Sequence, residues 1–168
     1  MLDFRWLKDM FQNQDLAVTR TGVAADCATQ HRVPIFTVSG GDVLVYGIIG
    51  KVRAQKAAAG QLLAFNFTAT GGASQVVAVA SATTTGDVAN KYYTWDGVLG
   101  NAPIVAQTGD AIGVGAVGSV LAGTSGAMNV FCPGVIDMTT SVADDGTGLI
   151  DWTIWYKALS VGAVVTAL

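Results

Sequence analysis

Over most of the chain, apolar and polar positions alternate with a period of two, which is the pattern of a β-strand with one buried face. The clearest example runs from Leu149 to Leu159. Its inward face is predicted to carry Ile150, Trp152, Ile154 and Tyr156, and its outward face Asp151, Thr153, Trp155 and Lys157. Because Trp155 is the one large apolar residue on the polar face, we expect it in an interface.

The segment from Val33 to Ala54 is predicted to form two strands joined by a hairpin turn at Gly40-Gly41, since paired glycines supply the positive φ angles of tight turns. The second strand, Val43 to Ile49, is apolar on both faces. One face is expected to carry Val43, Val45 and Ile49, and the other Leu44, Tyr46 and Ile48. Such a strand needs cover on both sides, from a second sheet, a partner chain or both.

Turn signals such as Gly71-Gly72 and Asp96-Gly97 separate further short apolar runs. Strands are expected at Gln61 to Thr70, Ser74 to Ala82, Lys91 to Trp95, Ile104 to Ala106, Ala111 to Val120, Met128 to Cys132, Val135 to Thr140 and Val161 to Ala167. The polar stretch Asp144 to Gly148 is expected to be a hairpin turn. The fold class predicted from this pattern is all-β, an antiparallel β-sandwich or jelly roll of about 8–10 strands.

The first 17 residues follow a different pattern, with large apolar residues at three- and four-residue spacing, typical of a short amphipathic helix. This helix either docks on its own domain or forms an arm that reaches a neighbouring subunit or a larger surface. Val18 to Arg32 is predicted to be a polar connection. The chain therefore divides into an N-terminal arm or helix with its connection, residues 1–32, and a β-sandwich domain, residues 33–168.

Charged residues make up only 12% of the 168 residues, against about 25% in typical globular proteins. With so few charged side chains, much of the surface of a monomer would be apolar. We therefore expect the protein to form an oligomer or to attach to something large. The net charge of −3 and the scattered basic residues argue against a nucleic-acid partner. No apolar run reaches the roughly 20 residues of a spanning helix, and charges near the N-terminus interrupt any signal peptide. We expect synthesis in the cytoplasm and no membrane partner.

Residues for catalysis or metal binding are few. His31 is the only histidine, and with Cys27 four residues before it the two would make only a weak metal site. There is no Glu, and most Asp residues fall in turns, so no catalytic pair is apparent. We expect no enzyme activity, no metal and no cofactor. Cys27 and Cys132 could form a disulfide, although reduced, buried thiols are the more common arrangement.

Two segments carry a resemblance to a known family: IFTVSGGDVLVYGIIGKV, Ile35 to Val52, and GLIDWTIWYKALSVGAVV, Gly148 to Val165. With the Ala-, Gly- and Thr-rich stretch between them, they resemble small bacteriophage virion proteins of the head-decoration, or cement, type. The resemblance covers about Val33 to Val165. It implies a jelly-roll fold without enzyme activity, often assembled as a homotrimer. It also implies a place on the outer surface of the capsid, where the protein clamps neighbouring copies of the major capsid protein.

In this interpretation, contacts to the capsid or to a neighbouring subunit are expected from Leu2, Phe4, Trp6, Leu7, Met10, Phe11 and Trp155. The alternative is a phage tail, fibre or spike component that binds a host glycan through loops such as Tyr92 to Trp95. Aromatic side chains beside a loop can stack on sugars. They can equally pack on a sheet, and this second arrangement is the one we expect here.

Overall fold

The structure is a computed structural model that describes residues 16–24, 32–55, 62–81, 87–95, 97–105, 129–140 and 148–168. Several sequence-based expectations lie outside these residues. They are the N-terminal helix or arm, the Cys27–His31 pair, the strand from Ala111 to Val120 and the turn at Asp144-Asp145.

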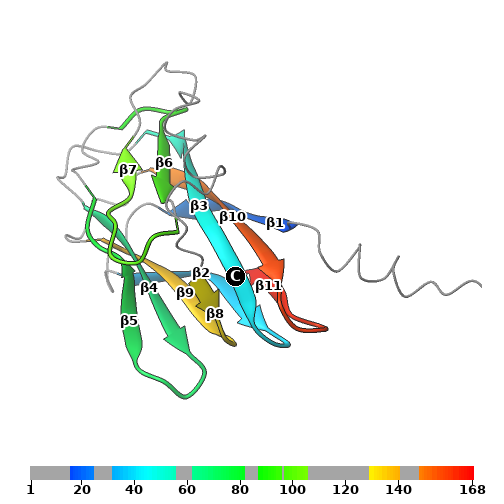
Figure 1. The fold of residues 1–168 in the computed structure, drawn as a ribbon. Coiled ribbons are helices and arrows are strands. Elements are labelled where there is room, and N and C mark those ends of the chain that lie inside the picture. Colours follow the sequence, from blue (N-terminus) through cyan, green and yellow to red (C-terminus); the bar gives the residue numbers. More distant parts are fainter. Residues whose placement is uncertain are drawn as a thin grey trace, which may run out of the picture.

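The described residues form eleven strands in two antiparallel sheets, which confirms the predicted all-β sandwich (Figure 1). Sheet A contains β1 (Leu16–Ala24), β10 (Leu149–Ala158), β3 (Val43–Ala54), β6 (Tyr92–Trp95), β7 (Ile104–Val105) and β8 (Asn129–Phe131). Sheet B contains β11 (Val164–Ala167), β2 (Arg32–Ser39), β9 (Gly134–Thr140), β4 (Leu63–Ala69) and β5 (Ser74–Ala78).

Eight of these strands have the order of a jelly roll. Sheet A contributes β1-β10-β3-β8, and sheet B contributes β2-β9-β4-β5. The chain therefore changes sheet at most of its turns, and Figure 1 shows the turns that join β2 to β3, β8 to β9 and β10 to β11 at one end of the molecule. The hairpin of β6 and β7 is inserted between β5 and β8, and β11 extends sheet B beyond β2. The jelly-roll prediction is thus confirmed by the strand order.

The predicted hairpin at Gly40-Gly41 is wrong, because β2 lies in sheet B and β3 in sheet A. The glycines do adopt positive φ, +74° at Gly40 and +144° at Gly41, but in a turn that crosses between the sheets. A Cβ on Gly40 would lie 2.8 Å from the carbonyl carbon of Gly162, where the chain crosses from β10 to β11. Since the inner faces of β2 and β3 are both apolar, packing them across the sandwich buries more surface than pairing them side by side.

The segment Leu16–Ala24 is a strand, β1, whereas the sequence predicted a polar connection from Val18 onward. Its residues look polar because β1 is an edge strand with one face outside the core. Val18 and Val23 pair with Ile154 and Ile150 of β10. The division of the chain at residue 32 stays a prediction, since residues 1–15 and 25–31 lie outside the described part.

Arg20 of β1 ties the two sheets together at this edge. Its guanidinium donates a hydrogen bond to the carbonyl oxygen of Pro34 in β2, which belongs to the other sheet. Burial lowers the pKa of the Arg20 guanidinium below its usual value. The ladder between β2 and β9 shifts register next to Pro34, so this bond lies at an irregularity of sheet B.

The expected facing of β3 is wrong in its second half. Trp155 of β10 pairs with Gly47, but Tyr156 pairs with Val45, so the ladder shifts register at this point. This bulge exchanges the two faces of β3. Ile48 is fully buried on the core side with Val43 and Val45, while Ile49 lies on the outer face.

The core between the sheets is rich in aromatic side chains. Phe65 packs edge-on against Trp152 with ring centroids 5.1 Å apart, and Tyr93 stacks on Trp152 at 6.2 Å. The predicted inward face of β10 is confirmed, since all four of its residues are buried. Packing of the aromatic strand is also confirmed, because Tyr93 and Trp95 are buried in the core.

We predict that Gly50→Ala destabilises the fold by about 1–3 kcal/mol, the usual cost of overpacking a core. Gly50 pairs with Trp152, and a Cβ at this position would lie 2.7 Å from the indole Cε3 atom, so the indole would have to move. Urea unfolding of the two proteins measures the difference. Lys51→Arg, at the exposed neighbouring position in the same strand, keeps a cation beside the Tyr92 ring and is the matched control, which should change stability by less than about 0.5 kcal/mol. Equal stability of both variants would contradict the assigned packing of Trp152.

Candidate interaction surfaces

One half of the outer face of sheet A is mostly apolar, with Lys157 of β10 as the charged residue that pairs with Leu44 there. β3 places Leu44, Tyr46 and Ile49 on this face, and β10 places Trp155 there. Val130 of β8 pairs with Leu44 and is 57% exposed. We call these five residues the apolar face. The second sheet covers only the inner face of β3. The cover expected for its outer apolar face therefore does not come from sheet B.

The other half of the same face is polar and charged. Lys51 and Arg53 continue β3, and the Lys51 ammonium lies 5.9 Å from the centre of the Tyr92 ring. Asp151 accepts a hydrogen bond of 2.6 Å from the Gly22 backbone N–H. The boundary between the two halves makes the apolar face a defined patch.

Two further exposed apolar residues lie at the end of the sandwich where the sheets exchange strands. Val161, in the turn between β10 and β11, is 78% exposed, and Leu159 beside it is 49% exposed. The Leu159 N–H donates to the Asp42 carbonyl oxygen at 2.9 Å, which holds this turn against the start of β3.

A second apolar feature is a groove of about 350 Å³ between the edge strands β5 and β8. Phe67 and Phe131 meet inside it with ring centroids 4.7 Å apart. The other lining residues are Ala69, Ala73, Gln75, Val77, Leu99, Asn129, Val130 and Cys132. All of these lining residues are uncharged, so the groove suits an apolar side chain.

Backbone contacts fix both ends of this groove. At one end the Gly100 N–H donates to the Val77 carbonyl oxygen at 3.0 Å, and the Asn129 side chain donates to the Gly97 carbonyl oxygen. At the other end the Thr70 N–H donates to the Pro133 carbonyl oxygen at 2.9 Å. The two walls are therefore held apart at a set width by the fold itself.

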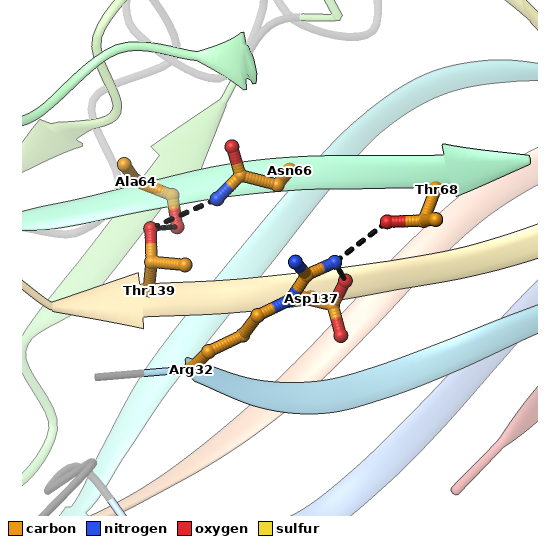
Figure 2. Close-up of polar contacts among 6 residues, drawn as sticks. All are labelled: Arg32, Ala64, Asn66, Thr68, Asp137 and Thr139. Carbon is orange, nitrogen blue, oxygen red and sulfur yellow. Dashed lines mark hydrogen bonds and ion pairs between the residues drawn. The ribbon is translucent and has the colours of Figure 1, made fainter. Parts of the chain in front are cut away.

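The outer face of sheet B carries a polar cluster (Figure 2). The Arg32 guanidinium forms an ion pair with Asp137 and also donates to the Thr68 hydroxyl at 2.6 Å. Asp137 is only 2% exposed, so its carboxylate needs this partner. Next to it, Asn66 donates to the Thr139 hydroxyl at 3.2 Å, and Figure 2 shows both side chains between β4 and β9.

A shallow cavity of about 420 Å³ lies over this cluster. Its lining residues are Arg32, Pro34, Thr68, Ser74, Val135 and Asp137, so it has no aromatic wall among the described residues. Because Arg32 already neutralises Asp137, the cavity offers little net charge to a ligand. We interpret the cluster as a structural bridge across strands β2, β9 and β4.

A second buried carboxylate, Asp87, has a similar structural role. It accepts hydrogen bonds from the Lys91 ammonium and, at 2.5 Å, from the Tyr93 hydroxyl. These contacts hold the segment before β6 to its own strand. Asp87 is thereby satisfied from within the fold.

The residues predicted to contact a partner fall into two groups. Trp155 lies on the outer face of sheet A, as predicted, and the structure adds four neighbours to it. The other predicted contacts lie outside the described residues: Leu2, Phe4, Trp6, Leu7, Met10 and Phe11. The sequence indicated that an outer apolar surface would include residues of β3, namely Leu44, Tyr46 and Ile49, because this strand is apolar on both faces. It gave no indication of Val130, because the position of Val130 depends on which strand pairs with β3.

Cys132 is a free, exposed thiol that lines the groove, which corrects the expectation that it is buried. Its place in the turn from β8 to β9 puts it at the surface. Across the described ranges, no group of three or more His, Cys or Asp side chains could hold a metal ion. No helix in this part of the chain is long and apolar enough to cross a membrane.

We predict that the Arg32–Asp137 pair contributes about 1–2 kcal/mol of coupling free energy. This is less than a fully buried pair, because the Arg32 side chain is 38% exposed and solvent screens it. A double-mutant cycle with Arg32→Met and Asp137→Asn, followed by urea unfolding, measures this coupling. The same cycle on Arg53 and Asp151, an exposed pair at 4.0 Å, is the control and should give less than about 0.5 kcal/mol. Equal coupling in both cycles would contradict a structural role for Asp137.

Comparisons with known proteins add little to this geometry. No protein-family model matches the sequence, and no curated protein matches it. A solved structure of infectious bursal disease virus, Gx strain, is similar at 13% identity and a TM-score of 0.29. That match covers 91% of this chain, which spans only 39% of the length of the other. Since the overlap of the two structures is low at this TM-score, the jelly-roll assignment rests on the strand order of this chain.

Proposed function

We propose that this protein is a structural virion protein of the decoration, or cement, type. It binds the outer surface of an assembled phage head and clamps neighbouring copies of the major capsid protein. The observation that carries the proposal is the apolar face, where Trp155, Tyr46 and Leu44 lie together on the outside of sheet A. A face of this kind at the surface of a chain with only 12% charged residues favours a permanent partner.

The physical basis of clamping is that a protein which binds only one state stabilises that state. Contacts that are individually weak become strong when they repeat over a lattice, since each bound copy raises the effective concentration of the next contact. The apolar face needs no deep pocket for this role. A flat, partly apolar sheet face is suited to lie on another flat surface.

The remaining parts of the proposal concern assembly and location. The protein acts as a homotrimer on the virion, is made in the host cytoplasm, and has no enzymatic role, no cofactor, no nucleic-acid partner and no membrane partner. Low charge and an exposed apolar surface support self-association. Light scattering in solution tests the trimer, whose mass would be three times the 17.2 kDa of one chain.

The aromatic segment named for the glycan-binding alternative lies mostly in the core. Tyr93 and Trp95 are buried there and are not available to stack on a sugar. Tyr92 alone of the three aromatic residues reaches the surface, beside Lys51 on the charged half of sheet A. A single, half-buried ring is a small platform for a sugar, so the capsid surface is the better supported partner.

The copy number in purified particles tests the proposal. Quantitative mass spectrometry of particles from the source of this protein gives its ratio to the major capsid protein. We expect a ratio near one copy per capsid subunit. A handful of copies per particle would favour a tail or spike component, and absence from the particles would contradict a virion role.

We predict that Trp155→Ser weakens attachment to particles by roughly 30-fold, the effect of losing about 2 kcal/mol at an interface hot spot. The fold should be retained, because Trp155 lies on the outer face of sheet A. Co-sedimentation of the variant with particles that lack the protein measures attachment, and urea unfolding checks stability. Thr37→Ala, on β2 of the other sheet, is the matched control and should bind like the unmodified chain. Full attachment of the Trp155 variant would place the capsid contact on another surface.

A further inference from the structure

We infer that the groove between β5 and β8 binds the N-terminal segment, residues 1–15, of a second copy of this chain. This inference rests on the proposed assembly role and names the contact that joins the subunits to one another. The groove and the segment are complementary in chemistry.

The groove has the properties of a docking site for one or two large apolar side chains. Its volume of about 350 Å³ lies at the small end of the range for ligand pockets, about 300–1,000 Å³. Phe67 and Phe131 line it, and Leu99 beside them is 58% exposed. Within the described residues, no strand pairs with the outer edge of β5 or of β8.

The chain itself supplies a matching occupant. Residues 1–15 have an apolar stripe beside polar residues, and Trp6 and Phe11 are its largest side chains. Large aromatic residues are the usual anchors of protein interfaces. None of the described lining residues is charged, so the groove favours the apolar stripe over the polar side of the segment.

The choice of a second copy over the same chain rests on the proposed homotrimer, because residues 1–15 are long enough to span the sandwich from Leu16. Leu16 pairs with Tyr156, Tyr156 with Val45, and Val45 with Asn129 at the groove. The segment therefore joins the sandwich at the β1 edge, three strand spacings or about 14 Å from the groove at the opposite edge. A segment that leaves one edge and a groove at the other edge give a head-to-tail contact. Such contacts close into rings when the rotation between subunits allows it.

Cys132 makes the contact testable, because its exposed thiol lines the groove. In a Cys27→Ser background, the acceptor chain keeps Cys132. The donor chain carries Cys132→Ser together with Lys8→Cys or Gln12→Cys. The two full-length chains, one with an affinity tag, are mixed and oxidised mildly. We expect a cross-linked pair of donor and acceptor on a non-reducing gel, since a disulfide requires Cα atoms within about 7 Å.

The matched control donor carries Thr166→Cys on β11, at the opposite edge of sheet B from β5, and should give no cross-link. Failure of both segment positions to cross-link would overturn the inference. In a single chain with both Gln12→Cys and Cys132, an intrachain disulfide without any interchain product would also overturn it. That outcome would show that the segment binds its own groove.

Light scattering supplies a second readout on the full chain. Ala73→Glu places a charge in the groove at an exposed position, so we expect this variant and Trp6→Asp to become monomers of 17.2 kDa. Thr166→Glu, exposed on β11 at the opposite edge of sheet B from β5, should assemble like the unmodified chain. Unchanged assembly of both Ala73→Glu and Trp6→Asp would contradict the inference.

Particle binding, measured in parallel, separates this inference from the proposed function. A cross-link between two chains that do not bind particles would support the groove contact and contradict the capsid role. Particle binding without any cross-link or change in assembly would support the capsid role and overturn the groove contact.

Discussion

The burial of two apolar sheet faces against each other is the interaction on which the rest of this structure depends. Sheet A contributes Trp152 and Ile154, and sheet B contributes Phe65 and Ile136, all fully buried. Strands that follow one another in the sequence mostly pack across this core instead of pairing side by side. The chain must then cross from sheet to sheet repeatedly, and that requirement produces the jelly-roll order.

The surfaces of the molecule are consequences of the same arrangement. Because only one side of β3 faces the core, its other apolar side becomes the outer surface around Trp155. Because β5 and β8 are edge strands of different sheets, the gap between them becomes a groove with Phe67 and Phe131 inside. Both surfaces are suited to contacts between proteins. In the proposed assembly, the apolar face would contact the shell and the groove would contact a neighbouring copy.

Part of the candidate site could be predicted from the sequence. Trp155 was recognisable, because a large apolar residue on the polar side of an alternating strand has no place in the core of a single sandwich. The groove was not recognisable, since its walls come from segments around Phe67 and Phe131 that lie more than sixty residues apart in the chain. The pairing of Arg32 with Asp137 is of the same kind, for each residue looks ordinary until β2 and β9 lie side by side.

By itself, the sequence determined most of the strands, the inward face of β10 and the all-β class, because a period of two depends on local geometry alone. It also determined that Gly40-Gly41 is a turn, since two glycines tolerate positive φ. Only the tertiary structure decided where that turn leads, that Leu16–Ala24 joins sheet A, and that the bulge at Gly47 turns Ile48 inward. Several distant segments of similar composition could pair with a given strand. Which of them pairs depends on the total apolar surface that the strands bury together, and no local sequence pattern contains that quantity.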